Sequence, residues 1–405
     1  MSPQATSFLQ SNLSGLHFPI KMASRSFEEV PVKREILYVG GEYTTITDGS
    51  PAQYMTGQIY VEKLTPSIAF RKCPIIFIAG GGQTGTNWLH TPDGRPGWAH
   101  FFLAYGFTVY LTDQPSRGRS AWYPSVGKMG ALSTFDIESM FTAVSSHDQW
   151  PQSKLHTQWP GTGKVGDPVF DAFYASQVPY RLDRLVAEDE NAKAYSVLLD
   201  QIGEAYIVTH SQAGAYGWRI GDARPHLVKG IVALEPSGPP CEKRPPFQGQ
   251  KIPFGITDGK LEYDPSAGAG GEHLRYVKVP AKSEDHYECI MQADPPKKLK
   301  NLSKIPVLVV TSEASYHAPY DYNTVIYLYV RPRYEIDVSD TNNSYLIPVL
   351  WLTLTSYHTS RQQAGVEVEY VDLPAEDIKG NGHMFFMELN NIEIAARVLK
   401  WLDKH

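Results

Sequence analysis

The stretch Glu204-Ala-Tyr-Ile-Val-Thr-His-Ser-Gln-Ala-Gly214 decides the fold class of this chain. Residues 205–208 have the apolar, β-branched composition of a buried strand, and small residues at helical spacing follow from Gly214. A sharp strand-to-helix turn exposes a serine Oγ above the sheet, and the next backbone N–H faces a developing oxyanion. Ser211 is therefore the candidate nucleophile, and Gln212 is a candidate oxyanion donor.

The residues around this turn leave a second interpretation open. Thr209 and Ala213 stand two positions to either side of Ser211, where the nucleophile turn usually has glycine. In the alternative, Ser211 only caps the helix that follows.

Length and charge exclude several classes of protein. With 405 residues, 42% hydrophobic and 20% charged, the chain can bury a large core and suits one large α/β domain with insertions. The net charge is −6, and the basic residues form no dense block. We therefore expect no nucleic-acid partner.

The cysteines and the apolar runs predict a location. Cys73, Cys241 and Cys289 lie far apart, which supports neither a disulfide framework nor a zinc site and favours a reducing compartment. The first twenty residues lack the pattern of a secretory signal, and the longest apolar stretch, residues 345–354, is too short to span a bilayer. The sequence predicts a cytoplasmic protein without a membrane partner.

The order of apolar runs predicts a mostly parallel central sheet flanked by helices, with antiparallel strands at the N-terminal side. A flexible arm is expected at residues 1–30, before one domain over residues 31–405. Strands separated by helical stretches indicate right-handed parallel crossovers. The expected strands are 34–39, 55–64, 74–79, 107–113, 205–208, 230–235, 305–311 and 366–373, and the expected helices include 98–105, 181–199 and 392–402.

Two segments interrupt this alternation. Residues 120–182 are rich in Trp, Tyr, Pro, Gly and His, with one helical piece at 135–144, and we interpret them as a lid over the site. A second Pro/Gly-rich insertion covers residues 237–299. Both would shape the substrate pocket, and neither identifies the substrate.

A serine nucleophile needs a base that a carboxylate orients. His383, in the loop Gly380-Asn-Gly-His383 between the last strand and the last helix, is the best-placed base, although it could merely cap that helix. Glu235 and Glu313 each end a predicted strand, where α/β sites assemble. The residues alone do not choose between these two acids.

The glycine run Gly80-Gly-Gly-Gln-Thr-Gly85 follows a strand and offers a second oxyanion donor. Backbone N–H groups of Gly81 and Gly82 could approach a substrate oxygen closely, because neither residue has a side chain. A phosphate cradle is the alternative, but the run lacks the Lys-Ser/Thr ending of a P-loop. The following loop, Asp113-Gln-Pro-Ser-Arg-Gly-Arg-Ser120, is expected to brace the site through Arg117 or Arg119.

Several motifs together resemble one group of α/β hydrolases, which contains a bacterial esterase with a Ser-His-Glu triad and fungal hydrolases of the fusarin and cytochalasan pathways. The resemblance spans most of residues 35–405 and implies an α/β-hydrolase fold. In the bacterial esterase the acid follows the strand after the nucleophile, which implies Glu235. Its oxyanion loop carries paired cysteines where this chain has glycines. The motifs are Gly82-Gln-Thr-Gly-Thr-Asn-Trp88, Thr91-Pro-Asp-Gly-Arg-Pro-Gly-Trp98, Asp113-Gln-Pro-Ser-Arg-Gly-Arg-Ser120, Thr209-His-Ser-Gln-Ala-Gly214, Glu313-Ala-Ser-Tyr-His-Ala-Pro-Tyr-Asp321 and Gly380-Asn-Gly-His383.

One segment departs from this group. Similar members run directly from a Tyr-Leu pair into Gln-Ala-Gly, whereas residues 329–361 separate Tyr327-Leu328 from Gln362-Gln-Ala-Gly365 here. Two explanations stay open, a translated retained intron or a surface insertion.

The resemblance and the motifs predict a serine hydrolase of the esterase or lactonase type. Its substrate would be a bulky apolar ester, lactone or amide, in fungal secondary metabolism. No metal or organic cofactor is expected, and the sequence leaves open whether the chain forms a homodimer. The alternatives are a non-hydrolytic cyclase or condensation catalyst on the same scaffold and a ligand-binding pseudo-hydrolase.

Overall fold

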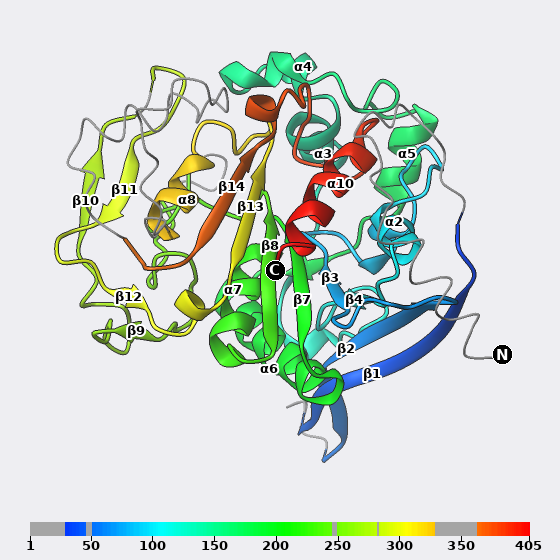
Figure 1. Cartoon of the computed structure of the whole chain (residues 1–405), viewed down its shortest axis with the longest axis horizontal. Coiled ribbons are helices and arrows are strands. Elements are labelled where there is room, and N and C mark those ends of the chain that lie inside the picture. The colour runs from blue at the N-terminus through cyan, green and yellow to red at the C-terminus, as the bar shows by residue number, and fades with distance from the viewer. Residues whose placement is uncertain (1–28, 46–50, 245–248, 282, 329–362) are drawn as a thin grey trace, which may run out of the picture.

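The computed structural model describes residues 29–45, 51–244, 249–281, 283–328 and 363–405. Its centre is an eight-stranded sheet in the order β1-β2-β4-β3-β7-β8-β13-β14 (Figure 1). Strands β1 and β2 are antiparallel, β2 is antiparallel to β4, and the remaining pairs are parallel. The strands are β1 (Val32–Thr45), β2 (Gln53–Pro66), β3 (Ile75–Ile78), β4 (Val109–Asp113), β7 (Ala205–His210), β8 (Val228–Leu234), β13 (Val307–Thr311) and β14 (Val368–Asp372).

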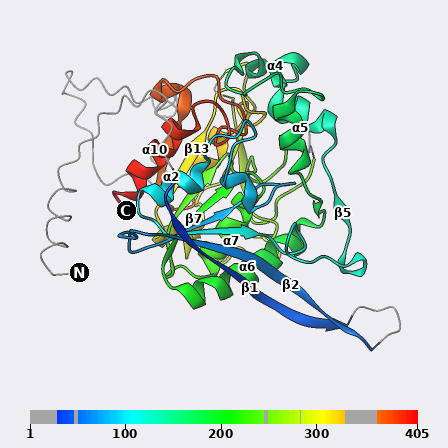
Figure 2. The ribbon, with the colours of Figure 1, turned by 90° about the vertical axis from the view of Figure 1, so that its right-hand side faces the viewer.

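The inner strands are short and apolar because helices cover the sheet on both faces. Every residue of β3, β4 and β7 is buried. Helices α2 (Trp98–Ala104) and α10 (Asn391–Leu402) pack on one face, and α6 (Arg184–Ile202) and α7 (Ala213–Ala223) pack on the other (Figure 2). The sheet therefore separates two hydrophobic cores. The mostly parallel sheet with antiparallel N-terminal strands agrees with the sequence prediction.

The segment between β4 and α6 is more helical than the sequence predicts. One helical piece at 135–144 is expected, but six short helices form. Helices of one or two turns are too brief to display a period, which explains the difference. The elements are η2 (Pro124–Val126), β5 (Met129–Gly130), α3 (Thr134–Ile137), η3 (Glu138–Thr142, a π-helix), α4 (Val144–His147), η4 (Pro151–Leu155), α5 (Pro168–Ala175) and β6 (Tyr180–Arg181).

Short strands β5 and β6 pair antiparallel and bring the two ends of this helical segment together. Asp167 caps α5 by accepting hydrogen bonds from Val169 N and Phe170 N, and Asp183 caps α6 by accepting one from Val186 N. The capping side chains fix where the insertion stops and the main fold resumes.

The second excursion, between β8 and β13, forms two small sheets. Strand β10 (Tyr276–Val279) pairs with β11 (Cys289–Gln292), and β12 (Lys298–Leu299) pairs with β9 (Tyr263–Asp264). Helix α8 (Tyr322–Leu328) packs against β11. The remaining one-turn 3₁₀ helices are η1 (Gly85–Trp88), η5 (Leu302–Lys304) and η6 (Leu373–Glu376).

Two sequence predictions concern residues outside the described ranges. The atypical insertion at 329–361 lies outside the described residues, and so does the arm at 1–30 except for its last two positions. Among the helices of the described ranges, none combines the length and the hydropathy of a bilayer span.

Candidate functional site

Ser211 follows directly after β7 and precedes α7, so it sits in the turn that the sequence predicts. Its φ of +54° lies in the left-handed region, which costs a non-glycine residue about 1–3 kcal/mol and persists only where neighbours enforce it. Ser211 N donates to Leu234 O at 3.0 Å, and Ser237 N donates to Ser211 O at 2.9 Å. The end of β8 thus holds the turn in place.

His383 and Glu235 come together although 148 positions separate them in the chain. His383 Nδ1 lies 3.3 Å from Glu235 Oε2, and both side chains are fully buried. Glu235 follows the last residue of β8 and also has a positive φ, +46°. If Nδ1 carries the proton donated to this carboxylate, Nε2 is left as the basic nitrogen of the ring.

Glu235 is also held by hydrogen bonds from the loop after β13. Ser312 donates to Glu235 Oε1 from its backbone N and its Oγ, both at 2.7 Å, and Ser315 Oγ donates to Oε2 at 2.6 Å. Burial alone would raise the pKa of Glu235, but hydrogen bonds from His317 and His383 outweigh it and hold that pKa well below its usual range. The carboxylate is therefore ionised and fixed in position.

His317 shares the same carboxylate oxygen. Its Nδ1 lies 3.3 Å from Glu235 Oε2, and burial lowers the pKa of His317 to about 4 although the hydrogen bond to Glu235 opposes that shift. His317 is therefore neutral near pH 7. One carboxylate oxygen thus contacts two imidazoles, and His383 is the one in the loop before the last helix, where the sequence places the base.

The side chain of Ser211 lies close enough to Tyr316 to oppose the rise in the pKa of Tyr316 that burial causes. Burial raises the pKa of Tyr316 above its usual value, so its hydroxyl keeps its proton and can donate. His383 Nε2 is buried and has no hydrogen-bond partner among the described residues. The Ser211–His383 hydrogen bond of an active triad therefore has still to form, as is common before substrate binds.

The structure brings Glu235, and not Glu313, to His383. Glu313 Oε2 accepts a hydrogen bond from Gly380 N at 2.8 Å, so Glu313 fixes one end of the loop that carries His383. Buried Glu388 fixes the same loop through Gly382 N at 3.0 Å. Of the two strand-end acids, Glu235 therefore contacts the imidazole of His383, and Glu313 contacts the backbone of the loop that carries it.

The glycine loop packs directly against the serine turn. A Cβ on Gly80 would lie 3.1 Å from Ser211 Cβ, and one on Gly81 would lie 3.4 Å from Gln212 Oε1. Gly82 has a φ of +75°, and a Cβ there would meet Gln177 of the insertion. Gly81 therefore lies closer to the turn than Gly82 does.

Arg117 ties this loop to the turn, as the sequence suggests for Arg117 or Arg119. Its guanidinium donates to Gly80 O at 2.8 Å and to Gln212 Oε1 at 2.9 Å. Arg119 instead pairs with Asp113 and Glu62, at 2.8 and 2.9 Å. Arg117 thus braces the two segments that offer oxyanion donors.

The helical insertion covers the site. The ring of Phe141, in η3, stacks on His383 with centroids 5.2 Å apart, and Trp150 Nε1 donates to Ala314 O at 3.3 Å. Tyr316 also lies against His383, at 4.8 Å between centroids. Ser211 is only 8% exposed beneath this aromatic cover, so a large substrate needs the cover to move.

Glu235, His317 and His383 also form a group whose possible metal-ligating atoms lie within 4.8 Å of one another. Both imidazoles face the carboxylate with Nδ1, as hydrogen-bond donors would. A nitrogen that carries a proton has no lone pair for a metal ion. This arrangement suits an orienting carboxylate better than a metal centre.

Comparison with known proteins identifies the family. No protein-family model matches the chain. The chain is 54% identical over 385 residues to probable secreted lipase phiG of a fungus (Fungal sp., strain ATCC 74256), a match that covers 94% of this chain and 93% of the relative. This chain belongs to the α/β-hydrolase superfamily.

A solved structure supports the same fold. The structure of a novel bacterial esterase matches with a TM-score of 0.57 at 20% identity, covering 94% of this chain and 98% of the esterase. The family expected from the sequence motifs is confirmed. This α/β hydrolase is a carboxylic ester hydrolase-like enzyme.

The predicted cytoplasmic location is wrong on this comparison, because the fungal relative is named as secreted. The prediction depended on the cysteines, on the first twenty residues and on the short apolar stretch, and Cys73, Cys241 and Cys289 are free in the structure. A hydrolase with a core of this size does not need disulfides for stability. Unpaired cysteines therefore carry little information about its compartment.

Sequence reasoning assigned no role to several residues of this α/β hydrolase's site. Ser312, Ser315, Tyr316 and His317 all lie in the loop after β13 and contact Glu235, His383 or Ser211. The available signal was their position, because loops at the carboxyl ends of parallel strands assemble α/β sites. A run of serine, tyrosine and histidine at such a strand end indicates a site.

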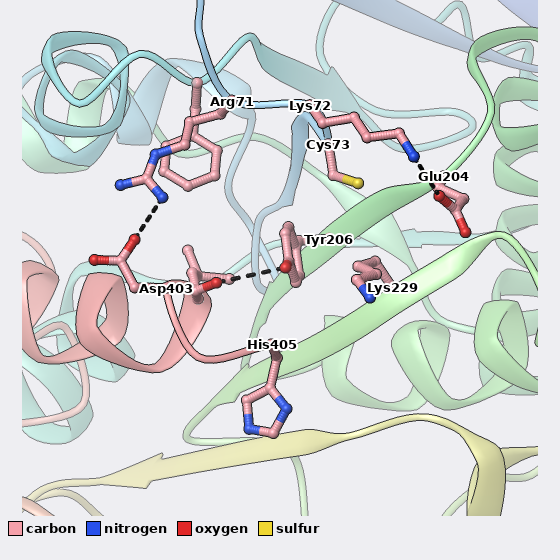
Figure 3. A pocket seen from close by; sticks show the side chains of 10 residues that line it. Arg71, Lys72, Cys73, Glu204, Tyr206, Lys229, Asp403 and His405 are labelled. Carbon is pink, nitrogen blue, oxygen red and sulfur yellow. Dashed lines mark hydrogen bonds and ion pairs between the residues drawn. The ribbon is translucent and has the colours of Figure 1, made fainter. Parts of the chain in front are cut away.

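A cavity of about 340 Å³ lies where the parallel strands β3, β7 and β8 begin, at the opposite end of these strands from Ser211 (Figure 3). Cys73 and Glu204 immediately precede the region where β3 and β7 begin, whereas Ser211 and Glu235 follow strand ends. Arg71 pairs with Asp403 at 2.6 Å across this cavity. The cavity is therefore separate from the triad; its lining residues are Arg71, Lys72, Cys73, Phe107, Glu204, Tyr206, Lys229, Leu402, Asp403 and His405.

Proposed function

We propose that this α/β hydrolase is a serine esterase that cleaves bulky apolar carboxylic esters or lactones through an acyl-enzyme. Ser211 attacks the carbonyl carbon, His383 takes the serine proton and passes it to the leaving oxygen, and Glu235 orients His383. Water then attacks the acyl-enzyme with His383 as base. The observation that carries the proposal is the 3.3 Å contact between His383 Nδ1 and Glu235 Oε2 beside a serine with a φ of +54°.

The oxyanion that forms on the substrate carbonyl needs fixed donors. We assign this role to Gln212 N–H and to the N–H of Gly81 or Gly82. The contact between Gly81 and the Gln212 side chain, and the brace from Arg117 to both segments, support this assignment. Preorganised donors of this kind contribute about 3–4 kcal/mol each to transition-state stabilisation.

The apolar character of the substrate is inferred from the cover over the site and from the relative. Phe141 and Tyr316 present aromatic rings to His383, and the fungal relative is named a lipase. The relative's name also supports a secreted enzyme. A role in fungal secondary metabolism remains a proposal that rests on the motifs shared with the fungal cluster hydrolases.

Hydrolysis of p-nitrophenyl esters with short and long acyl chains tests this function. The wild-type enzyme should hydrolyse the esters, and Ser211→Ala should lower kcat by at least about 10³-fold with an unchanged thermal midpoint. Full turnover by Ser211→Ala would contradict the nucleophile assignment. Conversion of an ester into an isomer without release of acid would favour the cyclase instead.

A further inference from the structure

Three residues outside the triad bring metal-ligating atoms together. Glu29 directly precedes the segment that enters β1, His90 follows η1, and His100 lies in α2. Glu29 Oε1 lies 2.8 Å from His90 Nε2 and 3.5 Å from His100 Nε2. The possible ligating atoms of all three residues lie within 4.8 Å of one another.

The donor set and its spacing suit zinc. Zn²⁺ binds imidazole nitrogen at about 2.0–2.1 Å and carboxylate oxygen at about 2.0–2.2 Å, so ligating atoms of a tetrahedral site are separated by roughly 3.3–3.5 Å. The distance from Glu29 Oε1 to His100 Nε2, 3.5 Å, lies in this range, and the distance to His90 Nε2, 2.8 Å, is shorter than the range. Small side-chain movements would therefore complete the geometry.

His100 provides an independent indication that a ligand belongs here. It is only 9% exposed, and neither of its ring nitrogens has a hydrogen-bond partner among the described residues. A buried polar group without a partner costs about 1–3 kcal/mol. A metal ion at His100 Nε2 would satisfy one of these nitrogens.

We propose that Glu29, His90 and His100 bind one Zn²⁺, with water as the fourth ligand. The ion ties the segment before β1 to the region of α2, and these residues are distinct from Ser211, His383 and Glu235. Binding therefore stabilises the fold. This site does not depend on the proposed function, because its ligands belong to no part of the triad.

Isothermal titration of the metal-stripped full chain with Zn²⁺ alone tests this proposal. Wild-type protein should bind one equivalent, and Co²⁺ in its place should produce a tetrahedral absorption spectrum. His90→Ala should weaken binding at least about 100-fold, because it removes a ligand from a side chain that is 50% exposed and does not support the core. His147→Ala is the matched control, since His147 also faces a carboxylate, that of Glu138 at 3.6 Å, and the described residues offer no third ligand there.

Thermal unfolding gives a second readout. Saturating Zn²⁺ should raise the thermal midpoint of wild-type protein and of His147→Ala, and leave that of His90→Ala unchanged. The proposal is overturned if wild-type protein binds no Zn²⁺ at millimolar concentration, or if His90→Ala binds as tightly as wild type. Loss of the bound equivalent in His383→Ala, with retention in His90→Ala, would assign the metal to the triad and also overturn it.

Discussion

His383 Nδ1 and Glu235 Oε2 lie 3.3 Å apart, with both side chains fully buried. Glu313 instead accepts a hydrogen bond from Gly380 N, at the start of the same loop. Two acids that follow neighbouring strands thus contact the same loop, Glu235 through the ring of His383 and Glu313 through the backbone of Gly380. Of these two acids, Glu235 is the one that contacts the imidazole ring and orients it.

Glu235→Gln should therefore lower kcat by about 10³–10⁴-fold, because an amide can present an N–H to His383 and stabilise the wrong tautomer. Glu313→Gln keeps an oxygen for Gly380 N and should change kcat by less than about 10-fold. Steady-state kinetics on one ester measure both variants. Equal losses in the two would show that the contact with His383 is not the deciding feature.

Tyr316→Phe removes the hydroxyl that interacts with the side chain of Ser211. We expect a change in kcat of up to about 10-fold, in line with the net 0.5–1.5 kcal/mol of one neutral hydrogen bond. The same substitution in a Ser211→Ala background should have no further effect on residual activity. Additive losses in this double-mutant cycle would place the action of Tyr316 somewhere other than on Ser211.

Gly80→Ala places a Cβ 2.8 Å from His210 Nδ1 and 3.1 Å from Ser211 Cβ, so the glycine loop must move away from the serine turn. We expect kcat to fall by about 10²-fold, since a small misplacement of a site costs about that much. Gly270→Ala is the control, because its Cβ meets only the Glu272 carboxylate at 3.4 Å. A Gly80→Ala enzyme with the kcat of wild type would contradict the tight packing between the glycine loop and the serine turn.

Acid should destabilise the enzyme partly through His317. Its pKa is about 4 in the folded state and about 6.5 when unfolded, so the unfolded chain binds more protons between these values. The free energy of unfolding should fall as pH decreases from about 6.5 to about 4, by about 1 kcal/mol per pH unit from this histidine.

Urea unfolding between pH 4.5 and 6.5 measures this slope. His317→Gln should reduce the slope by the contribution of one proton, whatever its effect on stability at pH 7. His226→Gln, at an exposed position, should leave the slope as in wild type. An unchanged slope in His317→Gln would contradict a neutral, buried His317.

The sequence predicts the main fold well because its signals are local. Residues 205–208 and the small residues after Ser211 encode a strand and a helix at a sharp turn, and the structure has β7 and α7 there. The chain order of Ser211, a strand-end acid and His383 also follows from strand ends and loops, and the family resemblance implies Glu235 as that acid. Composition and periodicity suffice for such features.

Other parts of the site depend on contacts that no local pattern records. Residue patterns alone leave Glu235 and Glu313 open, because the choice depends on which carboxylate faces His383 in space. The interaction between Tyr316 and Ser211 likewise joins two loops that are distant in the sequence. The short helices that place Phe141 over His383 lack a period. Spatial neighbours decide these features, and a single sequence does not state them.

Covalent trapping of the nucleophile tests the central claim most directly. Wild-type enzyme treated with a fluorophosphonate should gain the mass of one phosphonyl group, with the adduct in the peptide that contains Ser211, and should lose esterase activity in proportion to labelling. Ser211→Ala should gain no mass. An enzyme that remains unlabelled while it hydrolyses esters, or that carries the adduct on another residue, would contradict the account.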